Sequence, residues 1–428
     1  MNQKLNYHHP CIRNFLTLAL MGSGIIGYGQ SQHEPEGVLT LQRALELALM
    51  QSPELMGASY GVRAAEGNAQ QAGSWSNPTL ELNAEEFGGS GTRKGYNAAQ
   101  TTALLSQTLE LGGKRSKRRH VAEAETRLAG WEYEAKRRDV LMLTKKAYVD
   151  VMLAQGQLSL SESLLVVAED VRLTAAKRVQ SGKVAPLEET KAGVEVTSAR
   201  IARDRARREL DMARKRLAAT WGGTMPVFRE AGGEWEAVKD VPSLEALSGS
   251  LNNTPEVARW NDEVTLSRRV LAVAKSERIP DVSISAGISR FEEDGSNAGL
   301  VGLSLPLPLF NRNAGGILAA SHQVTRADFE QRAARLRTAT ELAEAHNRLA
   351  MARAESLATK AELLPGAQQA FDAAQTGYRD GKFGYLEVLD TQRTLSEARS
   401  RYLDVLAGYH KAAADVERLT GNPLNTIQ

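Results

Sequence analysis

Two carboxylates near the end of this chain, Glu387 and Asp390, are the residues whose type and spacing best suit a chemical role. Three positions apart in a helix, their side chains lie on one face. Carboxylates gathered on one face favour cations over anions, as in the charged rings of cation pores. The same acids could instead be first-turn residues that the helix dipole stabilises. The pair therefore indicates either a cation-attracting surface or an ordinary helix start.

Nothing in the sequence suggests catalysis or a bound cofactor. There is no HxH, CxxC or HExxH spacing, and no nucleophile–base set is visible. Gly113-Lys114 and Gly381-Lys382 lack the Walker spacing and its Ser/Thr. We therefore predict a protein that is not an enzyme, with no metal site and no cofactor.

The charge balance argues against a nucleic-acid partner. The chain has 53 Lys and Arg against 51 Asp and Glu. Residues 1–29 look like a secretory signal peptide, with Lys4 and Arg13 before a short apolar run; the alternative is a disordered N-terminus. Its removal takes away two basic residues and Cys11, which leaves 51 charges of each sign. A neutral chain lacks the basic excess of nucleic-acid binders.

The elements that must position these residues occur twice, about 200 residues apart. Pro53 and Pro255 are separated by 202 positions, and Gly182 and Gly381 by 199. A period this long indicates a duplicated half-domain rather than a solenoid. We expect a first repeat at 30–221, an irregular linker at 222–241 that packs around the middle of the helical part, a second repeat at 242–421 and a tail at 422–428.

Long helices fill most of each repeat. Residues 114–180 contain no proline and few glycines, and at 1.5 Å per residue they would form a helix of roughly 100 Å. Its narrow apolar stripe suits coiled-coil packing against neighbouring helices. The expected helices are 39–73 with an interruption at Ser52-Pro53, 114–180, 186–220, 314–380 with a kink at Pro365, and 385–420.

Two pairs of amphipathic segments predict strands at 78–88, 98–111, 280–291 and 298–309. Alternating strands of about ten residues are typical of outer-membrane barrel walls. The alternative is a small soluble β-subdomain. We expect an apolar set of side chains to face lipid and a polar set to face a wet lumen: Leu80, Leu82, Val282, Ile284 and Ile288 in the first, and Glu81, Asn83, Ser283 and Ser285 in the second.

Four strands cannot close a barrel, and an open edge in a bilayer leaves backbone groups unpaired. Strands that span a membrane must therefore be shared among subunits, and a homotrimer would supply twelve. The basic run at 114–119 directly follows the second strand. It would then lie at the periplasmic rim near lipid headgroups, or be only the solvated first turn of its helix.

The order of these elements over residues 38–421 resembles that of the TolC-like outer-membrane factors. The similarity lies in three segments: SQTLELGGKR at 106–115, PLPLFNRN at 306–313 and GYRDGKFGYLEVLD at 377–390. They are most similar to the heavy-metal, cobalt-zinc-cadmium type branch. The resemblance implies a mainly α protein with a transmembrane β-barrel portion, in which a homotrimer forms an α-helical barrel and a shared 12-stranded β-barrel.

The resemblance also implies a function and partners. The protein would be the outer-membrane channel of a tripartite efflux system, a passive exit duct for heavy-metal cations that extends into the periplasm. Its partners would be a periplasmic adaptor (membrane fusion protein), an inner-membrane resistance-nodulation-division pump and outer membrane lipid. Two alternatives remain open: a duct for multidrug efflux or type I protein secretion, and a soluble periplasmic coiled-coil adaptor.

Roles for the ends of the long helices follow from the same resemblance. Glu387 and Asp390 match acidic positions of a periplasmic gate. Tyr378 and Glu188 match a tyrosine–acid link that holds the gate shut, and Phe383 stands at the family's arginine position. The helix reversals match adaptor docking tips, or are merely exposed turns: Gly182, Lys183 and Val184 in the first repeat, and Gly381, Lys382 and Phe383 in the second.

Overall fold

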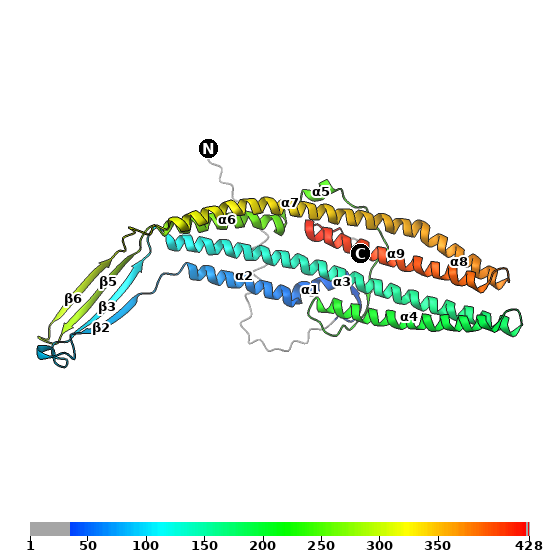
Figure 1. Cartoon of the computed structure of the whole chain (residues 1–428), viewed down its shortest axis with the longest axis horizontal. Coiled ribbons are helices and arrows are strands. Elements are labelled where there is room, and N and C mark those ends of the chain that lie inside the picture. Colours follow the sequence, from blue (N-terminus) through cyan, green and yellow to red (C-terminus); the bar gives the residue numbers. More distant parts are fainter. Residues whose placement is uncertain (1–34, 425–426, 428) are drawn as a thin grey trace.

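The computed structural model describes residues 35–424 and 427, so the predicted signal segment 1–29 lies outside the described residues. Figure 1 shows an elongated, gently curved molecule with a sheet at one end and two helical hairpin turns at the other. Between these ends the helices run nearly along the long axis. The sheet and the hairpin turns are therefore separated by the whole length of the helical part.

The first repeat is built around one uninterrupted helix of 67 residues, which occupies the range expected from the sequence. It runs unbroken because it contains no proline to remove a backbone donor. The stretch predicted at 39–73 is two helices, since Pro53 forces Ser52 out of the helical region. The helical elements are α1 (Leu41–Gln51), α2 (Pro53–Ala72), α3 (Lys114–Gln180) and α4 (Pro186–Ala219), with a 3₁₀ turn at Gly91–Arg93.

The second repeat differs in its long helix. The range predicted at 314–380 is divided into α7 (Ala314–Ala358), a π turn (Thr359–Leu363) and α8 (Leu364–Arg379). The interruption lies just before Pro365, where a kink was expected. The remaining helical elements are α5 (Leu244–Ser248), a 3₁₀ turn (Leu251–Asn253), α6 (Pro255–Ser276), for which no bounds were predicted, and α9 (Tyr385–Thr420).

The long helices stand side by side in one curved layer. Near the sheet their order is α2, α3, α6, α7, and toward the hairpin turns it is α4, α3, α9, α8. Helices α2 and α4 thus form one lateral edge of the layer, and α7 and α8 form the other. Within the described part of the protomer, neither edge is covered by a further long helix.

Four antiparallel strands continue this layer at one end of the molecule. They are β2 (Thr79–Glu85), β3 (Gln100–Leu109), β5 (Val282–Phe291) and β6 (Asn297–Ser304), in the spatial order β2-β3-β5-β6. The last strand was predicted to reach residue 309. It ends earlier because Pro306 and Pro308 have no N–H to donate to the ladder. The outer edges of β2 and β6 pair with no strand among the described residues.

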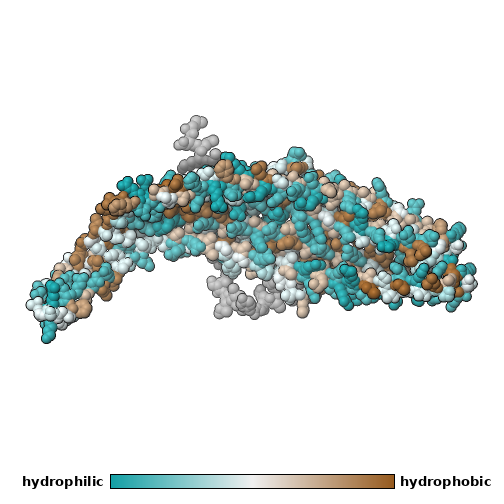
Figure 2. Space-filling view, in the orientation of Figure 1, coloured by the Kyte–Doolittle hydropathy of each residue, from teal (hydrophilic) through white to brown (hydrophobic). Residues whose placement is uncertain are grey.

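The register gives the sheet an apolar face and a more polar face. Leu82 pairs with Ala103, which pairs in turn with Ile288. On the opposite face, the hydroxyls of Thr102 and Ser289 lie 2.6 Å apart. The side chains predicted to face lipid therefore share one face, and those predicted to face a lumen share the other. Figure 2 shows apolar side chains along the sheet and its junction, whereas the helical part is largely polar.

Part of the basic run at the start of α3 is engaged within the protomer. The buried Lys114 ammonium lies 3.0 Å from the Asp281 carboxylate. The Arg118 guanidinium lies 2.8 Å from the Glu110 carboxylate. These two pairs tie α3 to the ends of the sheet. Arg115 lies over Trp75, with its guanidinium carbon 3.9 Å from the ring centre, and its charge stays near the surface.

The linker at 222–241 was predicted to be irregular, and this prediction is wrong in part. It contains β4 (Phe228–Gly232), which pairs in parallel with β1 (Gly37–Thr40). The Tyr148 hydroxyl of α3 donates to the carbonyls of Leu39 and Gly232. The small sheet is therefore fastened to the middle of the first repeat.

The remainder of the linker, residues 233–241, crosses to the second repeat and is called the strap below. His410 of α9 lies 2.6 Å from the Trp235 carbonyl through Nε2, and the two rings stack. A carbonyl can only accept, so Nε2 carries the proton, and burial lowers the pKa of His410. The Tyr409 hydroxyl also bonds the backbone of Lys239. The strap thus joins the two repeats at mid-height.

Among the described residues, one helix, α3, contains a stretch whose length and apolar composition would allow it to cross a membrane. That criterion does not distinguish a spanning helix from a packed one. Because α3 is flanked by α4 and α9 toward one end and by α2 and α6 toward the other, we assign it to the helical layer.

Candidate functional site

The candidate site lies at the two hairpin turns, where α3 reverses into α4 and α8 into α9. Each turn closes its helix in the same way. Gly182 has φ +69° and donates to the Val179 carbonyl, while Lys183 donates to the Arg178 carbonyl. Gly381 and Lys382 repeat this arrangement with Tyr378 and Gly377. Both are Schellman motifs, which need a left-handed residue that glycine adopts without strain.

The predicted tyrosine–acid link is formed. The Tyr378 hydroxyl of α8 donates to the Glu188 carboxylate of α4 at 3.3 Å, although 190 positions separate the two residues. Tyr378 is 2% exposed. Burial raises the pKa of its phenol, and the Glu188 carboxylate raises it further. The phenol therefore remains a hydrogen-bond donor, and the link joins the two hairpins.

A cation takes part in the link, but from a residue that the sequence analysis missed. The Arg178 guanidinium of α3 lies over the Tyr378 ring, 4.4 Å from its centre, and donates to the Tyr378 carbonyl at 3.2 Å. A second pair, Arg379 with Asp170, crosses between the same hairpins at 3.3 Å. The charged half of the link is therefore supplied by the end of α3.

Phe383, which the resemblance matches to an arginine of the family, packs locally. Its backbone N–H donates to the Gly377 carbonyl at 3.1 Å. A Cβ at Gly377 would lie 2.2 Å from the Phe383 ring. The ring thus closes over a glycine that leaves room for it, and this contact stabilises the second turn rather than joining the hairpins.

Glu387 and Asp390 lie in the first two turns of α9 and are both exposed. The Glu387 carboxylate folds back toward the backbone of Gly384, which precedes the helix. Among the described residues, neither carboxylate has an ion-pair partner within 4 Å. The geometry fits a helix-start acid, and it also leaves both charges free to act on a passing ion.

The predicted tips Lys183 and Lys382 are exposed, as are both turn glycines, while Val184 is partly covered. In the described part of the chain, no group of three or more His, Cys, Asp or Glu could hold a metal ion. The site brings together a link, two exposed turns and a pair of exposed acids, and no chelating centre among the residues the structure describes.

A four-stranded ribbon with one apolar face, carried on a tall curved layer of helices, defines the protomer of an outer-membrane channel of the TolC class. The chain belongs to the outer membrane efflux protein family, whose model matches residues 44–223 and 246–422. The two matched stretches correspond to the two repeats. The predicted family, the predicted fold class at the level of the protomer, and a place in the outer membrane with an extension into the periplasm are thereby confirmed.

Individual relatives carry names from heavy-metal resistance. The chain is 37% identical to the cobalt-zinc-cadmium resistance protein CzcC of Cupriavidus metallidurans, over 91% of each chain. It is 29% identical to the nickel-cobalt-cadmium resistance protein NccC of Alcaligenes xylosoxydans xylosoxydans, over 74% of this chain and 70% of the relative. The predicted heavy-metal resemblance is thus confirmed.

The crystal structure of the channel CusC superposes with a TM-score of 0.76 at 19% identity. The match covers 92% of this chain and 96% of that one. At this identity the comparison shows the fold alone. The outer membrane efflux proteins are a class of channels and not a class of enzymes, which agrees with the prediction for this chain.

Proposed function

We propose that this protein is the outer-membrane duct of a tripartite efflux system that exports heavy-metal cations. A resistance-nodulation-division pump and a periplasmic adaptor would deliver the cargo. The observation that carries the substrate class is the 37% identity to the cobalt-zinc-cadmium resistance protein over nearly the full length of both chains. The duct itself would be passive, with metal selection made by its partners.

The substrate class is tested in cells that lack this chain. We expect them to lose tolerance to cobalt, zinc or cadmium and to regain it when the chain is restored. Tolerance to drugs and the secretion of proteins should stay unchanged. The opposite pattern would assign the duct to multidrug efflux or type I protein secretion.

The protein would act as a homotrimer. The open strand edges β2 and β6 support this, because an edge in a bilayer must be paired. The lateral edges of the helical layer carry apolar residues at seven-residue spacing: Leu187, Val194 and Ile201 on α4, and Phe329 and Leu336 on α7, all more than half exposed. Two unlike edges on one protomer suit a head-to-tail ring. Three copies of four strands would give a barrel of twelve.

The hairpin turns would form the periplasmic entrance, with Tyr378 and Glu188 holding it shut. We expect Tyr378→Phe with Glu188→Ala to raise single-channel conductance several-fold in planar bilayers, because the substitutions remove the side-chain hydrogen bond that joins α8 to α4. Tyr133→Phe, at a partly buried position of α3 far from the turns, serves as the control. Unchanged conductance in the double variant would contradict the proposed role of the link.

The exposed turns would also be the docking points of the adaptor. Each presents a lysine beside a glycine that fixes a sharp reversal, Lys183 in one and Lys382 in the other. Lys183→Cys and Lys382→Cys give sites for crosslinking to the adaptor. Absence of a crosslink at both positions would place docking elsewhere.

A further inference from the structure

The two repeats differ in the continuity of their long helices. Helix α3 is regular throughout, whereas the matching helix of the second repeat is widened into a π turn at Thr359–Leu363. Pro365 explains the difference, since its ring would collide with the carbonyl of Ala361 in a regular helix. The position 199 residues earlier is Val166, which imposes no such constraint. π turns within α-helices are often found at functional sites.

The strap contacts α7 and α9 on the sheet side of the π turn, and its buried contacts are those with α9. Arg353 of α7 donates to the Lys239 carbonyl at 3.1 Å and pairs with Asp240. Tyr409 and His410 of α9 bind the same strap. Helices α7 and α9 are thus fixed to the strap, and through it to the first repeat, about two turns before the π turn begins.

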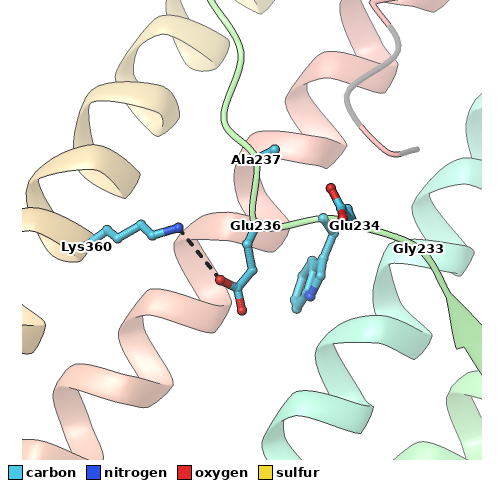
Figure 3. A pocket seen from close by; sticks show the side chains of 6 residues that line it. Gly233, Glu234, Glu236, Ala237 and Lys360 are labelled. Atoms are coloured by element: carbon cyan, nitrogen blue, oxygen red, sulfur yellow. Dashed lines mark ion pairs between the residues drawn. The ribbon is translucent and has the colours of Figure 1, made fainter.

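At the π turn itself the strap makes a much weaker contact. Lys360 lies 3.7 Å from Glu236, and the two side chains are 50% and 68% exposed. An ion pair this exposed breaks easily, so it can bias a conformational equilibrium by a few-fold but cannot lock it. A hollow of about 600 Å³ lies beside it, between the strap and Lys360. Figure 3 shows Lys360 reaching to Glu236 across this space, so the side chain has room to move.

On the other side of the π turn, α8 and α9 pack as one unit. Phe371, Val388 and Leu395 lie in one buried cluster, which also includes Val171 and Ala175 of α3 and Ala192 of α4. Arg399 of α9 also donates to the Gln368 side chain of α8 at 2.7 Å. Helix α9 continues past the level of the π turn, but a helix of 36 residues can bend gently without a break. The tip of the second repeat can therefore tilt as a body once its contacts with α3 and α4 separate.

We propose that the π turn at Thr359–Leu363 is the hinge of the periplasmic entrance and that the Glu236–Lys360 pair biases this hinge toward its closed setting. The proposal rests on the proposed function, because it concerns the regulation of the same entrance. The firm strap contacts supply the fixed side of the hinge, and the α8–α9 tip is the moving side. A movement of the strap would then displace Tyr378 and the two entrance acids, Glu387 and Asp390.

The hinge is tested by spin-label distances between the tips of the assembled trimer. Lys382→Cys places one label on each subunit, since the sole cysteine, Cys11, lies in the predicted signal peptide. We expect Lys360→Gln or Glu236→Gln to shift the distances to longer values and to raise conductance. The matched control is Arg200→Gln or Glu169→Gln, which removes an exposed pair at 3.0 Å between α4 and α3 of the same repeat and should change neither quantity.

A second variant works in the opposite direction. Deletion of Ala361 combined with Pro365→Ala restores a regular helix, and we expect it to narrow the distance distribution and lower conductance. If this variant fails to assemble, Lys360→Gln and Glu236→Gln alone test the hinge. Unchanged distances in both of them would overturn the hinge.

The double variant of the tyrosine–acid link distinguishes failure of the hinge proposal from failure of the proposed function. If Tyr378→Phe with Glu188→Ala opens the channel while the hinge variants do not, the hinge is wrong and the proposed duct stands. If the wild-type trimer itself conducts no ions, the proposed function fails first.

Discussion

Reversing the charge of the entrance with Glu387→Lys and Asp390→Lys is expected to turn a cation-preferring channel into an anion-preferring one. In the proposed trimer, three copies of two carboxylates would surround one opening. At a separation of about 8 Å in water, each charge changes the energy of a passing ion by roughly 0.5 kcal/mol, so six together contribute roughly 3 kcal/mol before salt screening. The permeability ratio should therefore change by at least about tenfold, measured as a reversal potential in a salt gradient.

Two controls separate this effect from helix stability. Glu387→Gln with Asp390→Asn removes the charges and should weaken the cation preference without reversing it. Glu245→Lys reverses an exposed first-turn acid of α5, far from the hairpin turns, and should leave the selectivity unchanged. If the double lysine variant loses thermal stability but keeps its cation preference, the two acids act only on the start of α9.

The elements that the sequence predicted well are those with a local cause. Helix α3 could be predicted from a long stretch without proline, and α4 and α9 from the glycine turns that precede them. Gly182 and Gly381 fix those turns through a conformation that other residues adopt only with strain. The duplicated spacing then placed the same turn in both repeats, although few residues are identical between them.

The features that were missed depend on contacts between distant segments. Arg178 lies among several basic residues at the end of α3, and nothing nearby in the sequence indicates that it lies over Tyr378, 200 positions away. The pairing of β4 with β1 joins segments almost as far apart, and each is too short to show an alternating pattern. The π turn was expected only as a kink, because Pro365 indicates an interruption without specifying its geometry.

The link at the tips includes a cation from a distant part of the sequence. The sequence resemblance alone sets Phe383 where the family would have an arginine, which suggested an incomplete link. The structure places the Arg178 guanidinium against the same tyrosine from the neighbouring hairpin. A cation over an aromatic ring is stabilised most when both are shielded from water, and Tyr378 is buried. The hairpins are therefore joined by a hydrogen bond and a cation–π contact that share one side chain.

Placing two carboxylates on the lateral edge of α4, with Val194→Asp and Ile201→Asp, is expected to prevent assembly and abolish conductance. These residues are 66% and 65% exposed in the protomer. Val194 lies midway between Ala192 and Val196, which are buried and face α3, so its side chain points to the opposite side of the helix. Ile201, seven positions further on, shares that side. Burying each apolar side chain in a neighbouring subunit is worth about 1.5–3 kcal/mol. An unpaired carboxylate would instead pay a desolvation cost of several kcal/mol.

The matched control carries the same change on the helix next to it. Val166 and Leu173 of α3 are 67% and 53% exposed and also seven positions apart. They lie on a helix that is flanked on both sides by helices of its own protomer, so Val166→Asp with Leu173→Asp should leave the trimer intact. Light scattering in mild detergent gives the subunit number for each variant. A trimer in both cases would show that the α4 edge is not the contact. A monomer in both would show that any pair of added charges disrupts the stem. Only loss of assembly confined to the α4 variant supports a ring closed by joining unlike edges.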